Sequence, residues 1–98
     1  MNKYETVIII NNNITQKQKN DVIKRIEKYI SENGNITLVK DLGTKKLAYQ
    51  INKNNYGYYY IIEFEAKAEI VLGLERLYRI IEEVLKFIVV RKEDNWYE

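Results

Sequence analysis

Apolar residues recur along this chain with two different spacings. Two stretches repeat them every three to four positions, which is the period of an amphipathic helix that buries one face. Four other stretches are short, rich in β-branched or aromatic residues and bounded by Asn or Gly, as strands commonly are. The helical stripes consist of Val22, Ile23, Ile26 and Ile30, and of Ile70, Val71, Leu74, Leu77, Tyr78 and Ile81. The predicted strands run from Lys3 to Ile10, Ile36 to Ile51, Tyr58 to Glu65, and Leu85 to Arg91.

Local signals mark where these elements begin and end. Thr15, with Gln18 three residues later, predicts a capping box that satisfies backbone N–H groups in the first turn of the first helix. Gly34 follows that helix and is expected in the left-handed conformation that often ends helices. Gly43 interrupts the second strand and predicts a bulge or a bend. The polar run at 52–55 predicts the turn between the second and third strands.

The resulting order of elements is β-α-β-β-α-β, which places the chain in the α+β class. Right-handed crossovers turn this order into a ferredoxin-like sandwich, with two helices on one face of a four-stranded antiparallel sheet of strand order 4-1-3-2. A length of 98 residues suits one hydrophobic core. We therefore predict a single ferredoxin-like domain over residues 1–92, followed by a short polar tail at 93–98.

The strands carry more apolar residues than a sheet with one covered face requires. Such strands should alternate apolar and polar residues, yet Tyr59 and Ile61 fall on the same side as Glu63, and the first and last strands are apolar on both sides. Central strands can carry such residues without a partner, but a contiguous apolar patch usually marks a binding surface. Whether a partner would meet a face or an edge of the sheet stays open. The predicted protein-partner interface consists of Tyr59, Ile61, Ile88 and Val90, extended by Trp96 and Tyr97 in the tail.

The residue types that catalysis needs are missing. The chain has no His and no Cys, and its only serine is Ser31, so no nucleophile–base pair can be drawn. Glu63 and Glu65 share one face of a strand but have no third acidic neighbour in the sequence, and there is no glycine-rich phosphate loop. We therefore expect no enzymatic activity, no metal site, no cofactor and no small-molecule substrate.

Hydropathy and net charge limit where the protein can be located and which partners it can bind. No window approaches eighteen consecutive apolar residues and the N-terminus has no targeting pattern, so we expect a protein of the cytoplasm or an organelle's interior, without a membrane span. The net charge is only +2, whereas proteins that hold a duplex by many phosphates carry a larger basic excess. Nucleic-acid binding therefore requires a small footprint, or one shared with a partner. Basic side chains that could supply it are Lys3, Lys45, Lys46 and Arg91, although surface cations often serve solvation alone.

Two other functions are compatible with this topology. Residues 57–61 weakly resemble the central motif of RNA-recognition motifs, which bind single strands by stacking. Tyr59 replaces the small residue of that motif, and Glu63 replaces its closing aromatic residue. A regulatory domain that senses small molecules would need glycine-rich loops between strand and helix, which residues 11–13 do not supply. Both functions stay as alternatives.

Residues 43–51, Gly-Thr-Lys-Lys-Leu-Ala-Tyr-Gln-Ile, strongly resemble the hallmark of protein six of the bacterial small ribosomal subunit. That hallmark is a glycine, two basic or polar residues and then Leu-Ala-Tyr-x-Ile. Two positions depart from the family pattern: Gln50 stands where proline is common, and Asn2 makes the N-terminal charge thinner. Four further segments are similar to the family in register, namely Tyr4-Glu5, Glu32-Asn33-Gly34, residues 74–80 and residues 84–91.

This resemblance implies a structural role in the platform of the small ribosomal subunit, on the ferredoxin-like fold. It also implies binding to the central domain of the 16S-type ribosomal RNA together with protein eighteen of the subunit, with the heterodimer as the RNA ligand. The apolar sheet residues are then expected to meet protein eighteen, and the basic residues Lys3, Lys45, Lys46 and Arg91 to contact RNA phosphates. The expected location is the ribosome of the cytoplasm, or that of an organelle.

Overall fold

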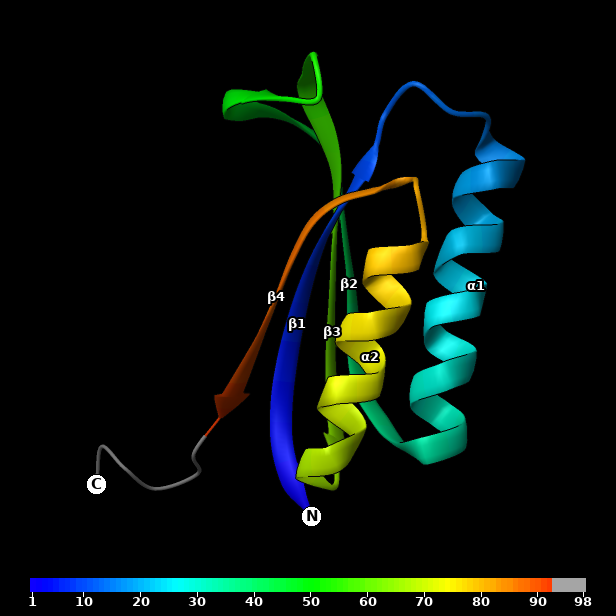
Figure 1. The fold of residues 1–98 in the computed structure, drawn as a ribbon, viewed down its shortest axis with the longest axis vertical. Helices are drawn as coiled ribbons and strands as arrows, with labels where there is room; N and C mark the ends of the chain where they lie inside the picture. The colour runs from blue at the N-terminus through cyan, green and yellow to red at the C-terminus, as the bar shows by residue number, and fades with distance from the viewer. Residues whose placement is uncertain (93–98) are drawn as a thin grey trace.

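Six elements follow one another in the predicted order in the computed structural model, which describes residues 1–92 (Figure 1). They are β1 (Asn2–Asn11), α1 (Gln16–Asn33), β2 (Gly34–Ile51), β3 (Asn54–Ala66), α2 (Ala68–Ile80) and β4 (Val84–Lys92). The antiparallel sheet has the order β2-β3-β1-β4, which is the predicted order read from the other edge. Both helices cover one face of this sheet, and the face away from them is named the open face here (Figure 1). The predicted fold is confirmed.

The core lies between the helices and the sheet, where the two apolar spacings meet. Alternate residues of β1 and β3 point toward the helices because side chains alternate along a strand, and Ile8 and Ile62 are fully buried there. The helical stripes complete this layer with Ile26 of α1 and Leu74 of α2, which are also fully buried. Burying each such side chain contributes about 1.5–3 kcal/mol, so this covered face holds the domain together.

One polar pair lies inside the core with its hydrogen bonds satisfied. Tyr78 Oη of α2 is 2.9 Å from Thr6 Oγ1 of β1, and Thr6 Oγ1 donates to the carbonyl of Ile88 in β4 at 3.0 Å. Burial raises the pKa of Tyr78, so its phenol stays protonated. The pair therefore joins one helix and two strands without leaving a buried polar atom unpaired.

The two ends of α1 differ in how well they match their sequence signals. The capping box is confirmed: Thr15 Oγ1 accepts from the backbone N–H of Gln18 at 3.1 Å, and Gln18 Oε1 accepts from that of Thr15 at 2.9 Å. The left-handed conformation predicted for Gly34 is wrong, because its φ of −166° is extended and the residue already belongs to β2. A Cβ at this position would collide with the Glu65 carbonyl oxygen and lie 2.9 Å from Ala66 Cβ. Glycine is needed here for the close approach of β2 to β3.

β2 and β3 form a long hairpin that contains the two predicted irregularities. Gly43, with φ 74°, lies at a register shift in β2, and its N–H donates to Asp41 Oδ1 at 3.0 Å. The turn has two central residues, Asn52 with φ 48° and Lys53 with φ 66°, which is the pattern of a type I′ turn. The end of the hairpin that carries this turn bends over toward the open face (Figure 1).

Candidate functional site

The open face carries apolar side chains in rows that cross three strands. Residues directly opposite each other in an antiparallel pair share a face, and the register places Val7 of β1 between Ile61 of β3 and Ile88 of β4. In the next row Ile9 lies opposite Tyr59. Ile88 is 49% exposed, and Val7 and Ile61 are half-buried. Three of the predicted interface residues thus lie together on this face.

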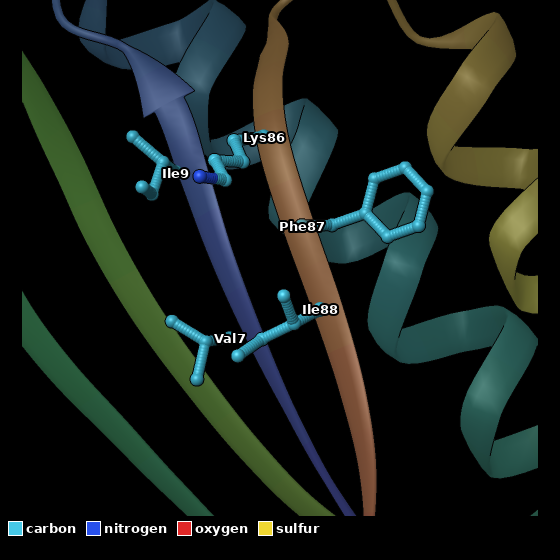
Figure 2. A pocket seen from close by; sticks show the side chains of 5 residues that line it. All are labelled: Val7, Ile9, Lys86, Phe87 and Ile88. Atoms are coloured by element: carbon cyan, nitrogen blue, oxygen red, sulfur yellow. The ribbon is translucent and has the colours of Figure 1, made fainter.

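The apolar rows surround a shallow hollow of about 180 Å³ between β1 and β4 (Figure 2). Figure 2 shows Val7, Ile9 and Ile88 gathered on one side of the two strands, with the Lys86 ammonium group beside Ile9. Phe87 points the other way and packs against an aromatic ring of α2, with centroids 4.9 Å apart. The hollow is therefore an apolar recess with a cation at its rim.

Charged residues lie at the end of the apolar rows where β1 begins. Glu5 lies opposite Glu63 of β3 and Val90 of β4. Two opposed carboxylates repel each other, and Lys92 offsets this because its Nζ is 3.2 Å from Glu63 Oε1 and 4.0 Å from Glu5 Oε1. Val90 is 49% exposed and is the fourth predicted interface residue on the open face. The apolar surface thus ends at a charged, partly neutralised border.

The bent hairpin bounds the rows at the opposite end. Lys86 Nζ donates to Tyr49 Oη at 2.9 Å, and this hydrogen bond raises the pKa of Lys86. Lys86 therefore carries its charge throughout the ordinary pH range. A partner that covers the apolar rows would meet this fixed cation at one end and the carboxylates of Glu5 and Glu63 at the other.

Two of the basic residues predicted to contact RNA lie on the hairpin. Lys45 lies opposite Gly57 and Lys46 opposite Tyr56, without a register shift between the two pairs. Successive side chains of a strand point to opposite faces, so the exposed side chains of Lys45 and Lys46 leave the hairpin on different sides. A single flat surface can therefore meet only one of them directly.

The other two predicted RNA contacts lie far from the hairpin lysines. Lys3 pairs with Glu65, which is about 26 Å from Gly57 along a strand that rises about 3.3 Å per residue. Arg91 lies at the same end of the sheet and donates to Asn2 Oδ1 at 3.0 Å. Folding therefore does not bring these four cations into one patch. The hairpin pair and the terminal pair are separate features.

The residues that form the open-face site are not all the ones that the sequence predicted. Trp96 and Tyr97, predicted to extend the interface, lie outside the described residues. Val7, Ile9 and Lys86 belong to the open-face site and were not predicted. The apolar runs in the first and last strands indicated that both faces of these strands are apolar. Which alternate residues point toward the helices and which toward the open face depends on the register of the strands, and the sequence does not give that register.

The described surface offers docking chemistry. Within residues 1–92, no three His, Cys, Asp or Glu side chains are grouped so that they could hold a metal ion. No helix in that range is long and apolar enough to cross a membrane. What the open face provides is apolar contact area between charged borders, which is the usual anatomy of a macromolecular interface.

Comparison with known proteins shows what this chain is similar to. Residues 3–91 match the family model of ribosomal protein S6. Small ribosomal subunit protein bS6 from Alkaliphilus oremlandii is 37% identical over 93 residues, which are 95% of this chain and 99% of that protein. Small ribosomal subunit protein bS6 from Nitratiruptor sp. is 40% identical over 94 residues, which are 95% of this chain and 73% of that protein. The crystal structure of 30S ribosomal protein S6 from Thermotoga maritima has a TM-score of 0.89 at 31% identity and covers 93% of this chain and 87% of that chain.

Proposed function

This chain belongs to the ribosomal protein S6 family of the small ribosomal subunit, and on that premise we propose that it binds the central domain of the 16S-type ribosomal RNA together with protein eighteen of the subunit. Members of the family are structural proteins and not enzymes, and family membership implies a location in the ribosome. The proposal adds the protein partner and the RNA domain, and places the chain in the ribosome of the cytoplasm or in that of an organelle.

The apolar open face is the observation that carries this proposal. The row formed by Ile61, Val7 and Ile88 crosses three strands, and Ile88 is about half exposed. Contiguous apolar rows on an exposed sheet face, bordered by charged residues, are typical of protein–protein interaction sites. Docking of protein eighteen on these rows removes them from water, which is the main favourable term in most protein association.

The charge distribution supports RNA binding that is shared with the partner. The net charge of +2 is too small for a large phosphate footprint. Lys45 and Lys46 project from the hairpin at one end of the apolar rows, beside the surface assigned to protein eighteen. Lysine offers a point charge with rotatable donors, which suits phosphate oxygens. The two proteins together therefore form the RNA ligand.

An RNA-recognition motif that stacks bases fits the open face less well. Tyr59 is the one aromatic residue among the described open-face positions of β1 and β3, and Glu5 and Glu63 lie two residues beyond the Val7–Ile61 row. Stacking modules commonly use two or three aromatic residues on these central strands. Opposed carboxylates would also repel the phosphates of a bound strand.

A sedimentation experiment tests the proposed function. A tagged copy of the chain is expressed in bacterial cells, and the lysate is separated on a sucrose gradient. The tagged chain is expected to co-migrate with small subunits and with protein eighteen. A tagged chain that stays at the top of the gradient, in cells whose native copy has been depleted, would show that the assignment to the subunit is wrong.

A further inference from the structure

The hairpin tip crosses over the sheet to reach a strand at the opposite edge. β2 and β4 are the two edge strands, with β3 and β1 between them. Nevertheless Lys86 Nζ of β4 donates to Tyr49 Oη of β2 at 2.9 Å, and the ammonium group lies 5.4 Å from the centre of the Tyr49 ring. This contact is possible because the tip bends over the open face (Figure 1). Two edges of one sheet are thereby joined across its open face.

Leu47 anchors the bent tip to the sheet beneath it. Its side chain is only 7% exposed, although it lies outside the main core between the sheet and the helices. A Cβ added to Gly57 would lie 3.3 Å from Leu47 Cδ2 and would collide with Ile9 Cγ2. Leu47 and Ile9 therefore close over Gly57 from two sides, and a hydrogen atom is all that fits between them.

The strand ladder does little to hold this part of the hairpin. Pairing passes from Lys46 with Tyr56 directly to Ile51 with Asn54, so residues 47–50 face a single residue of β3. Few ladder hydrogen bonds are available to such an unequal stretch. The side-chain contacts of Leu47 and Tyr49 tie this stretch to the rest of the molecule, and on the other strand of the tip Asn54 Oδ1 accepts from Asn13 Nδ2 at 2.8 Å.

We propose that Leu47 and Tyr49 form a clamp that holds the hairpin tip across the open face and so positions Lys45 and Lys46 for RNA. The two lysines directly precede Leu47 and pair regularly with Gly57 and Tyr56 of β3. The clamp fixes the arm of the hairpin that carries them, and so fixes where the two lysines lie relative to the open face. This inference rests on the proposed function for its RNA ligand. Leu47 and Tyr49 are positioning residues in this account, because they act through the neighbouring lysines.

The clamp also couples the RNA contact to the protein partner. Leu47 and Tyr49 of the clamp lie against Ile9 and Lys86, and these two residues line the apolar hollow that the partner is proposed to cover. A partner seated on the hollow excludes water from the Lys86–Tyr49 hydrogen bond, and a hydrogen bond shielded from water is electrostatically stronger. Docking of protein eighteen therefore tightens the clamp, which makes the heterodimer a better RNA ligand than the isolated chain.

Hydrogen exchange of the isolated chain tests the clamp without any ligand. Tyr49→Phe removes the acceptor of the Lys86 hydrogen bond, and Leu47→Ala removes the anchor. Amides of residues 47–56 should exchange about 3- to 10-fold faster in Tyr49→Phe, and faster still in Leu47→Ala, because the tip opens locally. Amides in the centre of β1 should keep their rates. Tyr56→Phe is the matched control, since this exposed tyrosine lies on the other side of the hairpin. Equal exchange of the tip in all four proteins would overturn the clamp.

RNA affinity of the heterodimer then tests the positioning role. At saturating protein eighteen, Tyr49→Phe and Leu47→Ala should weaken binding to a central-domain RNA fragment about 3- to 10-fold, while Tyr56→Phe binds like wild type. If the tip amides exchange faster in these variants but the RNA affinity is unchanged, the clamp exists but does not position the lysines for RNA. A wild-type heterodimer that fails to bind the RNA would refute the proposed function instead, and the exchange rates would still decide on the clamp.

Discussion

At the scale of single residues, the backbone of Lys53 is strained at the tip of the hairpin. Its φ of 66° is left-handed, as is that of Asn52 before it. The left-handed conformation costs a residue with a Cβ about 1–2 kcal/mol, whereas asparagine tolerates it better. Type I′ turns for this reason favour glycine at the second central position.

Replacing Lys53 by glycine should stabilise the protein. Relief of the left-handed strain is offset by the extra entropy that glycine loses on folding, about 0.5–1 kcal/mol, so the expected net gain is about 0.5–1 kcal/mol. Urea unfolding measures it. Lys40→Gly is the control, because Lys40 lies in extended β2, where glycine should lower stability. A Lys53→Gly variant that loses stability as Lys40→Gly does would contradict the type I′ turn.

Gly34 shows why some residue conformations cannot be predicted from the chain. A glycine just after a helix usually adopts the left-handed conformation, and the sequence around Gly34 favours that outcome. The structure uses the same glycine for a different reason, the contact with Ala66 of β3. That contact joins residues far apart in the sequence, so no local pattern contains it. The capping box at Thr15 was predictable because both partners lie within one helical turn.

At the scale of elements, α1 is joined to the sheet by two tyrosines with raised pKa values. Tyr60 Oη donates to Glu27 Oε2 of α1 at 3.0 Å, and Lys19 Nζ of α1 lies 4.0 Å from the centre of the Tyr58 ring. Burial, followed by the carboxylate of Asp41, raises the pKa of Tyr58 to about 12. Burial and then the Glu27 carboxylate raise the pKa of Tyr60 as well. Both phenols are therefore held in the protonated form.

These tyrosines predict a loss of stability in alkali. A group whose pKa is higher in the folded state stabilises the fold fully below its unfolded pKa, here about 10. That contribution is lost as the pH rises from about 10 through about 12. The free energy of unfolding should therefore fall between about pH 10 and pH 12. Tyr60→Phe should show a smaller fall than Tyr56→Phe, which changes an exposed tyrosine. If the free energy of unfolding falls equally in both variants, ionisation of Tyr60 is not responsible for the loss of stability.

The hairpin lysines predict how RNA binding depends on salt. Each lost phosphate contact flattens the line of log affinity against log salt concentration by about 0.7–0.9 units. The side chains of Lys45 and Lys46 leave the hairpin on different sides, so one of them is expected to contact a phosphate. A Lys45→Ala/Lys46→Ala variant, bound to protein eighteen, should therefore have a slope smaller by about 0.7–0.9 units, with unchanged thermal unfolding. A Lys24→Ala/Lys28→Ala variant carries the same charge loss on exposed positions of α1 and should keep the slope. If both variants flatten the slope equally, the net charge of the protein governs the salt dependence, and direct contact of the hairpin lysines with RNA does not.

The elements themselves could be predicted, but their mutual placement could not. β1 and β3 follow from short β-branched and aromatic runs between turn residues, and both helices follow from their apolar stripes. The bend that brings Tyr49 to Lys86 depends on packing of Leu47 against Gly57 and Ile9, which is a tertiary contact. The sequence could therefore suggest a basic hairpin, but not its position over the open face.

At the scale of the whole molecule, the sheet has two apolar faces with different roles. The covered face packs Ile8 and Ile62 against the helices and stabilises the fold. The open face presents Val7, Ile61 and Ile88 between charged borders and is the surface that we propose for protein eighteen. Substitutions on the open face should therefore separate binding from stability, which substitutions in the core cannot do.

Calorimetric titration with protein eighteen tests this assignment most directly. Truncating an anchor in a desolvated interface commonly costs about 1–2 kcal/mol or more, so Tyr59→Ala and Val90→Ser should each weaken pairing by about 5- to 30-fold. Their unfolding free energies should stay within about 1 kcal/mol of wild type, because Val90 is half exposed and Tyr59 lies outside the core. Leu72→Ser, at an exposed position of α2, should pair like wild type. Unchanged pairing in both open-face variants, with Leu72→Ser weakened, would place the partner on the helices and contradict the account.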